Sequence, residues 1–361
     1  MRDQGGGVIR AFGLRDSLFV HRLQKRGVRL DIDQAMVCAC SPLRTALVTP
    51  IPWYMNGVAT YILRAQVHGR QLDGFIQVRR RADRSEADLI FLSPDLGVEE
   101  APEIWRRLLQ YSYQKACDNG IQRLYASLPD GTEELRLLRE ASFSLYTREE
   151  LFRLHRMADS SRPVSSEGIR PLREGDSWQL RRLYAQYTPQ PVQLAEGALG
   201  GESRPPFLAN VDWADAQSYV LAEGGEISGV VQVLSGPNGC LLRLWGDTMN
   251  RAHMERLLDW GVAVATRAAS QPVYLAVRDY QGGLLGLLEE RNFEHVGRGA
   301  RLVKYLVRAE RVPATEMAPA LEPRAEAITT ISRLGPLVGH WEVEQSLPVC
   351  DEQPASVMTM N

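Results

Sequence analysis

The sequence predicts two copies of one α/β domain in tandem. This prediction rests on the chain length, on internal repeats, and on the order of the expected strands and helices. The 361 residues suffice for two domains with ordinary hydrophobic cores. With 44% hydrophobic and 24% charged residues, the composition is typical of a globular protein.

Four short blocks recur in the same order along the chain, which predicts a duplicated domain. Ile9-Arg10 and Asp16-Ser17 return as Ile169-Arg170 and Asp176-Ser177, at a common offset of 169 − 9 = 160. The offset then falls to 155 and about 150, as loop deletions in the second copy would produce. The later blocks are 74–78 with 229–233, 124–130 with 273–279, and 137–143 with 287–293.

Each copy is expected to follow one order of elements. A short strand leads through Asp16 or Asp176, both expected as helix N-caps, into a helix, and a polar, proline-bearing stretch follows. Three strands, an amphipathic helix, a strand, a second helix and a closing strand complete the copy. The expected first strands are 8–12 and 168–172, and the three-strand sets are 59–67, 74–81 and 87–93, then 218–222, 229–235 and 240–245.

Composition sets the expected boundaries. The domains are expected at 1–156 and 168–308, joined by a linker over 157–167 that is rich in Ser and Pro. The stretch 309–361 is acidic and contains several prolines, so a mostly disordered tail is expected there.

The order of elements resembles the GNAT N-acetyltransferase superfamily over most of the chain. The motif Leu-Leu-x-x-x-x-Phe, which ends at Phe143 and Phe293, is similar to that family's helix followed by a "Gly-Phe" strand start, with Ser142 and Asn292 in place of Gly. The resemblance implies a mixed, mostly antiparallel twisted sheet flanked by helices. It also implies an acyl-CoA-dependent N-acyltransferase, with acetyl-CoA or another acyl-CoA as co-substrate and a small-molecule or peptide amine as acceptor.

In that family the cofactor pyrophosphate lies at the N-terminus of the helix after the fourth strand, where free backbone N–H groups attract phosphate. In the first copy, Glu99, Glu100 and Glu103 crowd this turn, so the sequence predicts a poor phosphate site there. The second copy is neutral to basic at this position, and Arg251 is a possible phosphate partner. The cofactor-binding residues that the resemblance implies are Leu244, Trp245, Gly246, Met249, Asn250, Arg251 and Ala252.

The family often protonates the leaving thiolate with a Tyr, but Leu138 and Leu288 stand at that position in the two copies. Tyr146, Tyr274 and Tyr280 are candidate substitutes, although the role of a half-buried aromatic residue is favoured for each. Asp247, directly after the fourth strand of the second copy, is the candidate base, and a turn or capping role fits it too. The sequence therefore predicts an N-acyltransferase centred on the second copy. A catalytically inactive binding or assembly module is the alternative, because both copies lack the family's phosphate loop and Tyr.

Other classes of function find no support in the composition. The net charge of −2 argues against a nucleic-acid partner, and no apolar run reaches the roughly 18 residues that a membrane span needs. Five scattered cysteines without metal-ligand spacing predict reduced thiols in the cytoplasm and no metal site. The one dense basic cluster, Arg79 to Arg81 with Arg84, is expected on a solvated hairpin turn.

Overall fold

A computed structural model describes residues 8–49, 52–53, 57–67, 69–82, 84–154, 166–198, 205–208, 211–268 and 272–306. The predicted tail at 309–361 and most of the predicted linker, 157–165, lie outside the described residues. The domain boundaries of the sequence analysis stay a prediction.

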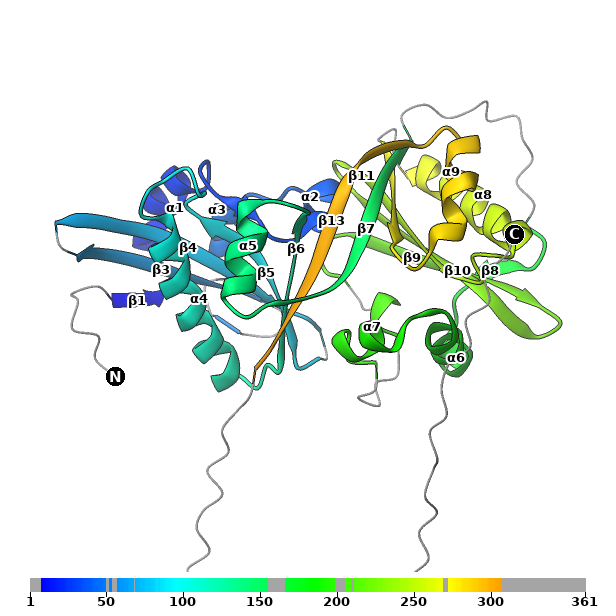
Figure 1. Cartoon of the computed structure of the whole chain (residues 1–361), viewed down its shortest axis with the longest axis horizontal. Coiled ribbons are helices and arrows are strands. Elements are labelled where there is room, and N and C mark those ends of the chain that lie inside the picture. The colour runs from blue at the N-terminus through cyan, green and yellow to red at the C-terminus, as the bar shows by residue number, and fades with distance from the viewer. Residues whose placement is uncertain are drawn as a thin grey trace, which may run out of the picture. The chain divides into compact units, whose positions relative to one another are not determined.

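The two halves of the described chain repeat one order of elements (Figure 1). The first half comprises β1 (Val8–Ala11), η1 (Leu14–Asp16), α1 (Ser17–Leu23), β2 (Val28–Arg29), α2 (Ile32–Val37), α3 (Pro42–Val48), β3 (Val58–Val67), β4 (Arg70–Arg80), β5 (Glu86–Ser93), α4 (Ala101–Asp118), β6 (Arg123–Pro129), α5 (Glu133–Glu140) and β7 (Ser144–Leu154). The second half comprises β8 (Ile169–Pro171), η2 (Glu174–Asp176), α6 (Ser177–Tyr187), α7 (Gln190–Ala195), η3 (Pro206–Leu208), β9 (Asp215–Glu223), β10 (Glu226–Gly236), β11 (Gly239–Gly246), α8 (Arg251–Ala268), β12 (Val273–Arg278), η4 (Gly282–Leu284), α9 (Leu285–Glu290) and β13 (Glu294–Tyr305).

The predicted strands and long helices are confirmed, with ends that differ by a few residues. The polar, proline-bearing stretches hold short helices that the sequence analysis did not predict. These are α2 and α3 in the first half and α7 in the second. Each is six or seven residues long, too short for a hydrophobic stripe to stand out.

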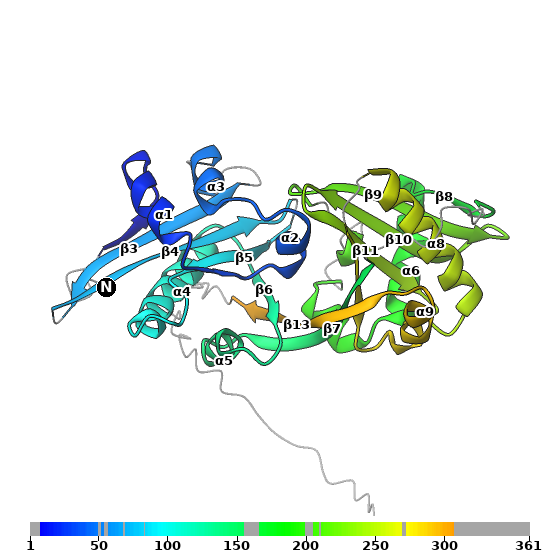
Figure 2. The ribbon, with the colours of Figure 1, turned by 90° about the horizontal axis from the view of Figure 1, so that it is seen from above.

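The halves exchange their last strands. The sheet order is β1-β3-β4-β5-β6-β13-β7-β12-β11-β10-β9-β8, with β2 paired to β5 off this path. Strand β13 from the end of the second half therefore lies against β6 of the first half, and β7 from the first half lies against β12. Figures 1 and 2 show the two exchanged strands side by side where the halves meet. One sheet thus runs through both halves, and it is mostly antiparallel, as predicted.

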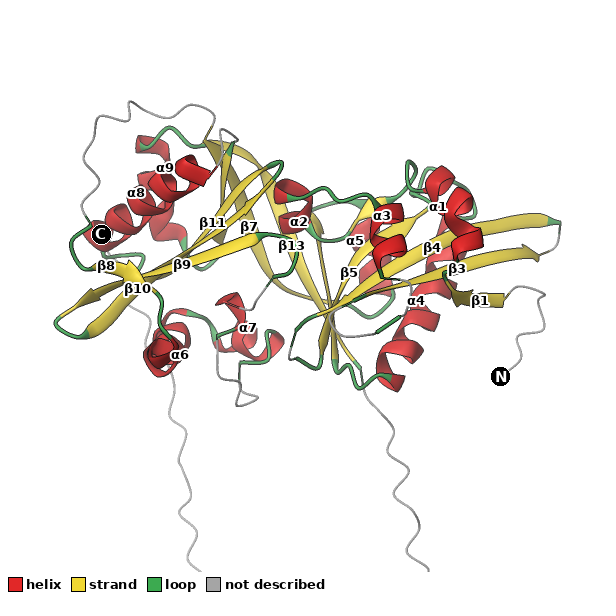
Figure 3. Cartoon of the chain, turned by 180° about the vertical axis from the view of Figure 1, so that it is seen from behind, coloured by secondary structure: helices red, strands yellow, loops and turns green. Residues whose placement is uncertain are grey.

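Helices cover both faces of this sheet in each half (Figure 3). In the first half, α4 and α5 pack on one face through a large apolar cluster that includes Trp105, and α1 and α3 pack on the other around Phe19. In the second half, α8 and α9 cover one face around Leu257, and α6 covers the opposite face around Leu183. Successive side chains of a strand point to opposite faces of the sheet, so the apolar residues of the strands contribute to the core on both faces.

The repeated Arg and Asp near each start form an ion pair in which the Asp side chain is the buried member. Asp16 and Asp176 stand at the N-cap positions of α1 and α6, as predicted, but their carboxylates form no capping hydrogen bond with these helices. The Asp16 carboxylate accepts two hydrogen bonds of 2.6 Å from the Arg10 guanidinium, and Asp176 accepts bonds of 2.7 and 2.8 Å from Arg170. A 3-10 turn precedes each helix, so the Asp is the last residue of that turn. Its carboxylate reaches back to the N–H of the residue three positions earlier, and not forward into the helix.

The residues in place of the family's Gly take the backbone conformation that favours glycine. Ser142 has a φ of 67° and Asn292 a φ of 57°, directly after α5 and α9. The left-handed turn is thus kept in both halves although Gly is replaced in both. Asn accepts this conformation more readily than Ser does.

Candidate functional site

In each half, two parallel neighbouring strands separate after three paired residues. Strand β5 pairs with β6 from Glu86 opposite Arg123 to Asp88 opposite Tyr125. Strand β11 pairs with β12 from Cys240 to Leu242. Both strands continue beyond the paired part, so a gap opens between them in each half.

The chain itself fills the gap of the first half. The Leu30 N–H donates to the Ile90 carbonyl at 3.1 Å, and the Ser127 N–H donates to the Leu30 carbonyl at 2.7 Å. The Ile32 N–H donates to Ser127 Oγ at 2.9 Å, and β2 pairs with the end of β5. A segment of backbone, 28–32, therefore takes the place between β5 and β6 along the separated part of these strands.

The gap of the second half is bridged by one side-chain amide. Gln281 Nε2 donates to the Leu244 carbonyl at 2.9 Å, and Gln281 Oε1 accepts from the Arg278 N–H at 3.0 Å. Close by, Gly283 lies so near the loop before α8 that a Cβ added there would be 2.5 Å from the Thr248 carbonyl oxygen. The two gaps are thus unequal, because a side chain is displaced more easily than hydrogen-bonded backbone.

The predicted cofactor residues at the strand end lie beside this second gap. Leu244 and Trp245 are buried, in the core clusters of opposite faces of the sheet. Gly246 ends β11 with a φ of 154°, a conformation that L side chains rarely adopt.

The predicted residues at the start of α8 are mostly exposed. Met249 has 83% of its surface exposed, and Ala252 is exposed in the first turn of α8. Asn250 caps the helix, since its side-chain oxygen accepts from the His253 N–H at 3.3 Å. Arg251 forms ion pairs with Glu255 at 3.3 Å and, more closely, with Glu290.

The start of α4 in the first half is acidic, as the sequence indicated. Glu100 is the N-cap residue, and Glu103 in the first turn pairs with Arg106 at 2.8 Å and Arg107 at 2.5 Å. These carboxylates occupy the positive end of the helix dipole.

The candidate base Asp247 lies in a cavity of about 450 Å³ at the end of β11. One carboxylate oxygen accepts from the Met249 N–H at 3.0 Å. Two more carboxylates, Glu223 and Glu226, share the cavity with the aromatic rings of Trp178 and Tyr187. Glu223 is paired with Arg256 and with His253, the latter at 3.2 Å.

Tyr280 is not in that cavity. Burial raises the pKa of its hydroxyl, and the charged groups that act on it, Arg278 and Glu196, belong to a different site at the meeting of the halves. The structure therefore does not bring the two candidate catalytic residues, Asp247 and Tyr280, to one cavity.

Comparison with known structures identifies the fold. A GCN5-related N-acetyltransferase from Sphaerobacter thermophilus matches at a TM-score of 0.50 and 14% identity, covering 84% of this chain and 96% of that one. The chain has the GNAT fold. Two further matches are a tandem GNAT protein from the clavulanic acid biosynthesis pathway (TM-score 0.47, 12% identity, 84% and 100% covered) and a GCN5-related N-acetyltransferase from Anabaena variabilis (0.40, 14%, 83% and 73%). No family model and no curated protein matches the sequence.

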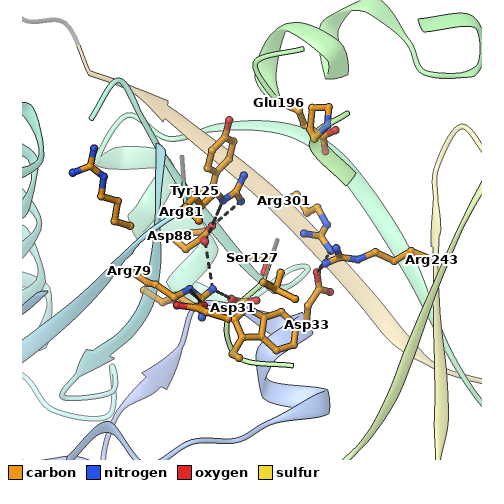
Figure 4. A pocket seen from close by; sticks show the side chains of 18 of the residues that line it. Asp31, Asp33, Arg79, Arg81, Asp88, Tyr125, Ser127, Glu196, Arg243 and Arg301 are labelled. Atoms are coloured by element: carbon orange, nitrogen blue, oxygen red, sulfur yellow. Dashed lines mark hydrogen bonds and ion pairs between the residues drawn. The ribbon is translucent and has the colours of Figure 1, made fainter. Parts of the chain in front are cut away.

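The two GNAT-fold halves enclose a second cavity, of about 280 Å³, where their exchanged strands meet (Figure 4). Its wall includes six arginines: Arg79, Arg80, Arg81, Arg243, Arg278 and Arg301. It also includes five carboxylates: Asp31, Asp33, Asp88, Glu196 and Asp212. We call this space the central cavity.

The predicted hairpin turn lies between β4 and β5, but its expected solvation is wrong, because Arg79 to Arg81 line this cavity and Arg84 is buried. Arg79 is only 5% exposed and pairs with Asp31 at 2.6 Å and Asp88 at 3.3 Å. Arg81 pairs with Asp88 at 2.7 Å, with its guanidinium 4.0 Å from the centre of the Tyr125 ring. Glu86 and Asp88, which pair with Arg81, follow closely in the sequence, whereas Asp31, which pairs with Arg79, is far away in the sequence.

Ion pairs in the central cavity link the two halves. Asp33 of α2 pairs with Arg243 of β11 and with Arg301 of β13, the latter at 2.6 Å. Burial raises the pKa of the Asp33 carboxyl, but Arg301 and Arg243 outweigh burial and hold that pKa below its usual value. On the other side, Arg278 pairs with Glu149 at 2.5 Å and Glu196 at 2.9 Å.

Sequence reasoning missed the acidic half of this network. Asp33, Glu149 and Glu196 are nearly fully buried, and charged residues are almost never so buried unless they are paired. Acidic residues within an expected strand, such as Glu149 in the closing strand of the first copy, were the available signal. Among the described residues no group of acidic, His or Cys side chains could hold a metal ion, and no helix is long and apolar enough to cross a membrane.

Proposed function

We propose that the protein is an acyl-CoA-dependent N-acyltransferase whose second half holds the acyl-CoA, with the first half as its structural partner. The observation that supports this division is the inequality of the two strand gaps. Backbone of segment 28–32 is bonded to both strands of the first gap, whereas one amide, that of Gln281, bridges the second.

The residues of the second half fit an acyl-CoA better than those of the first. At the start of α8, Arg251 supplies a positive charge, and its partners Glu255 and Glu290 lie at the surface with it. Surface ion pairs are weak, so a polyphosphate can displace them. At the start of α4, Glu100 and Glu103 would repel a phosphate, so we derive no cofactor site there.

An acyl-CoA would supply a thioester carbonyl that an amine can attack. The chain's own contribution is to hold that carbonyl at the end of β11, from Leu244 to Gly246, and to place an amine beside it. In the cavity of Asp247, three carboxylates face one arginine, Arg182, and one histidine, His253. This charge balance favours a protonated amine, and Asp247 is the group we assign to take up its proton. Tyr280 is given no step, because it does not line the cavity of Asp247.

Acetyl-CoA added to the full chain tests the proposal. A ligand at 100 times its Kd stabilises the folded state by about 2.7 kcal/mol, so the melting temperature should rise. Arg251→Glu should abolish the rise. Arg106→Glu, the matched change at an exposed arginine of α4, should leave it intact. Survival of the rise in Arg251→Glu would show that the phosphates bind elsewhere.

A second measurement tests the chemistry. With a set of amines, release of free thiol from acetyl-CoA should depend on Asp247, so Asp247→Asn should keep the melting-temperature rise and lose thiol release. Equal thiol release by Asp247→Asn would remove this residue from the role of base.

The second candidate is a catalytically inactive GNAT-fold binding module. Two observations favour it: both carboxylate partners of Arg251 are already in place, and the buried Leu288 stands where the family often has its Tyr. If neither acetyl-CoA nor longer acyl-CoAs change the melting temperature, the transferase is rejected and the inactive binding module is the function that fits.

A further inference from the structure

Three buried polar atoms, each in a residue that lines the central cavity, have no hydrogen-bond partner within the described parts of the chain. They are Nη1 of Arg79, Nη1 of Arg278 and Oδ1 of Asp33. The exposed fractions of these residues are 5%, 7% and 2%. Buried polar groups are nearly always paired, so unpaired atoms of this kind indicate a ligand, an ion or ordered water.

The unpaired atoms are of two kinds, and this restricts what can satisfy them. The two guanidinium nitrogens are donors and need an acceptor of negative charge, such as a carboxylate. The Asp33 oxygen is an acceptor and needs a donor, such as an ammonium group. A simple anion would bind the arginines but would be repelled by Asp33. A simple cation would bind Asp33 but would be repelled by the arginines.

The charge of the wall agrees with a ligand that is itself nearly neutral. Six arginines face five carboxylates, and most of them already compensate one another in the ion pairs described above. A volume of about 280 Å³ is just below the usual range of ligand sites, roughly 300–1,000 Å³, which favours a ligand far smaller than a nucleotide.

We propose that the central cavity binds a small zwitterion of the amino-acid class. Its carboxylate is held by Arg79 of the first half and Arg278 of the second, and its ammonium by Asp33. This site borders the acyl-CoA gap through Trp245, shares no lining residue with the cavity of Asp247, and does not depend on the proposed acyl transfer. Because Arg79 and Arg278 come from different halves, the ligand stabilises the contact between them.

Calorimetric titration of the full chain with the twenty L-amino acids tests the site, with acyl-CoA absent. Each amino acid that binds is compared with its amide, which lacks the carboxylate, and with its 2-hydroxy acid, which lacks the ammonium. We expect at least one amino acid to bind and both of its derivatives to bind at least tenfold more weakly. No binding by any amino acid, as when water alone satisfies these atoms, or equal binding of an amide, would overturn the proposal.

Two kinds of variant locate the binding. Arg278→Lys keeps the positive charge beside Glu149 and removes the guanidinium fork, so binding should weaken at least tenfold. Arg84→Lys is the matched control, since Arg84 is also buried and paired with a carboxylate, that of Glu86, but is not in the cavity wall. Val211→Trp fills the cavity without changing any charge, and it should abolish binding even if Arg278→Lys fails to fold. Unchanged affinity in Val211→Trp would place the ligand elsewhere.

The result is independent of the acetyl-CoA experiment. Failure of acetyl-CoA to raise the melting temperature would reject the transferase and leave the amino-acid titration to be judged on its own. Conversely, acetyl-CoA binding without any amino-acid binding would reject the central site alone.

Discussion

Removing the Leu30 side chain should destabilise the protein strongly, because segment 28–32 is part of the first half's core. Leu30 is fully buried, and its backbone N–H and carbonyl bond to β5 and β6 respectively. Leu→Ala changes at such sites cost about 3 to 5 kcal/mol, from lost burial and from the cavity left behind. We expect about 3 kcal/mol for Leu30→Ala, since the backbone bonds of the segment remain.

Urea denaturation followed by circular dichroism measures this loss, with Leu18→Ala as the control. Leu18 is 84% exposed, so its truncation should change the free energy of unfolding by less than about 0.5 kcal/mol. A loss below about 1 kcal/mol in Leu30→Ala would show that the segment does not fill the gap as described. A new acetyl-CoA response in Leu30→Ala that survives Arg251→Glu would refute the structural role of the first half.

Three further changes have predicted outcomes. Ser142→Gly should stabilise the protein by about 0.5 to 1 kcal/mol in urea denaturation, since a non-glycine residue in the left-handed region costs about 1 to 2 kcal/mol, while Asn292→Gly should gain less. Gly283→Ala should lower the urea midpoint because its Cβ would press on backbone 2.5 Å away, whereas Gly282→Ala, with no atom within 4 Å, should not. The pKa of the Asp176 carboxyl is lowered mainly by its bonds to Arg170, so its contribution to stability is full above the unfolded-state pKa near 4 and is lost as the pH falls through the lower folded-state pKa. Asp176→Asn should therefore flatten the acid side of the stability-versus-pH curve, and an unchanged slope would contradict the ion pair.

The fold was largely predictable because the duplication and the local patterns agree. Apolar residues are concentrated in the hairpin strands and each long helix carries an apolar stripe, so element order followed directly. The sequence shows that an Arg and an Asp recur in the first repeated block. The structure explains this recurrence, because the two residues form an ion pair in each half, Arg10–Asp16 and Arg170–Asp176.

The strand exchange was not predictable from these patterns. A closing strand such as β7 has the same sequence pattern whether it pairs within its own half or with β12 of the other, because periodicity reports burial and not the identity of the neighbour. For the same reason, the central cavity could not be predicted from the sequence. Its wall combines Asp33, Arg79, Arg243 and Arg301, which are far apart in sequence and meet only because the last strands cross.

The two halves differ in how the gap between their diverging parallel strands is closed. In the first half that gap is closed by hydrogen-bonded backbone around Leu30, and the neighbouring residues Asp31 and Asp33 turn toward the central cavity. The segment that closes one gap therefore helps to build the wall of a different site. Closure of the first gap and construction of the charged central cavity thus both depend on the placement of the backbone from Val28 to Asp33.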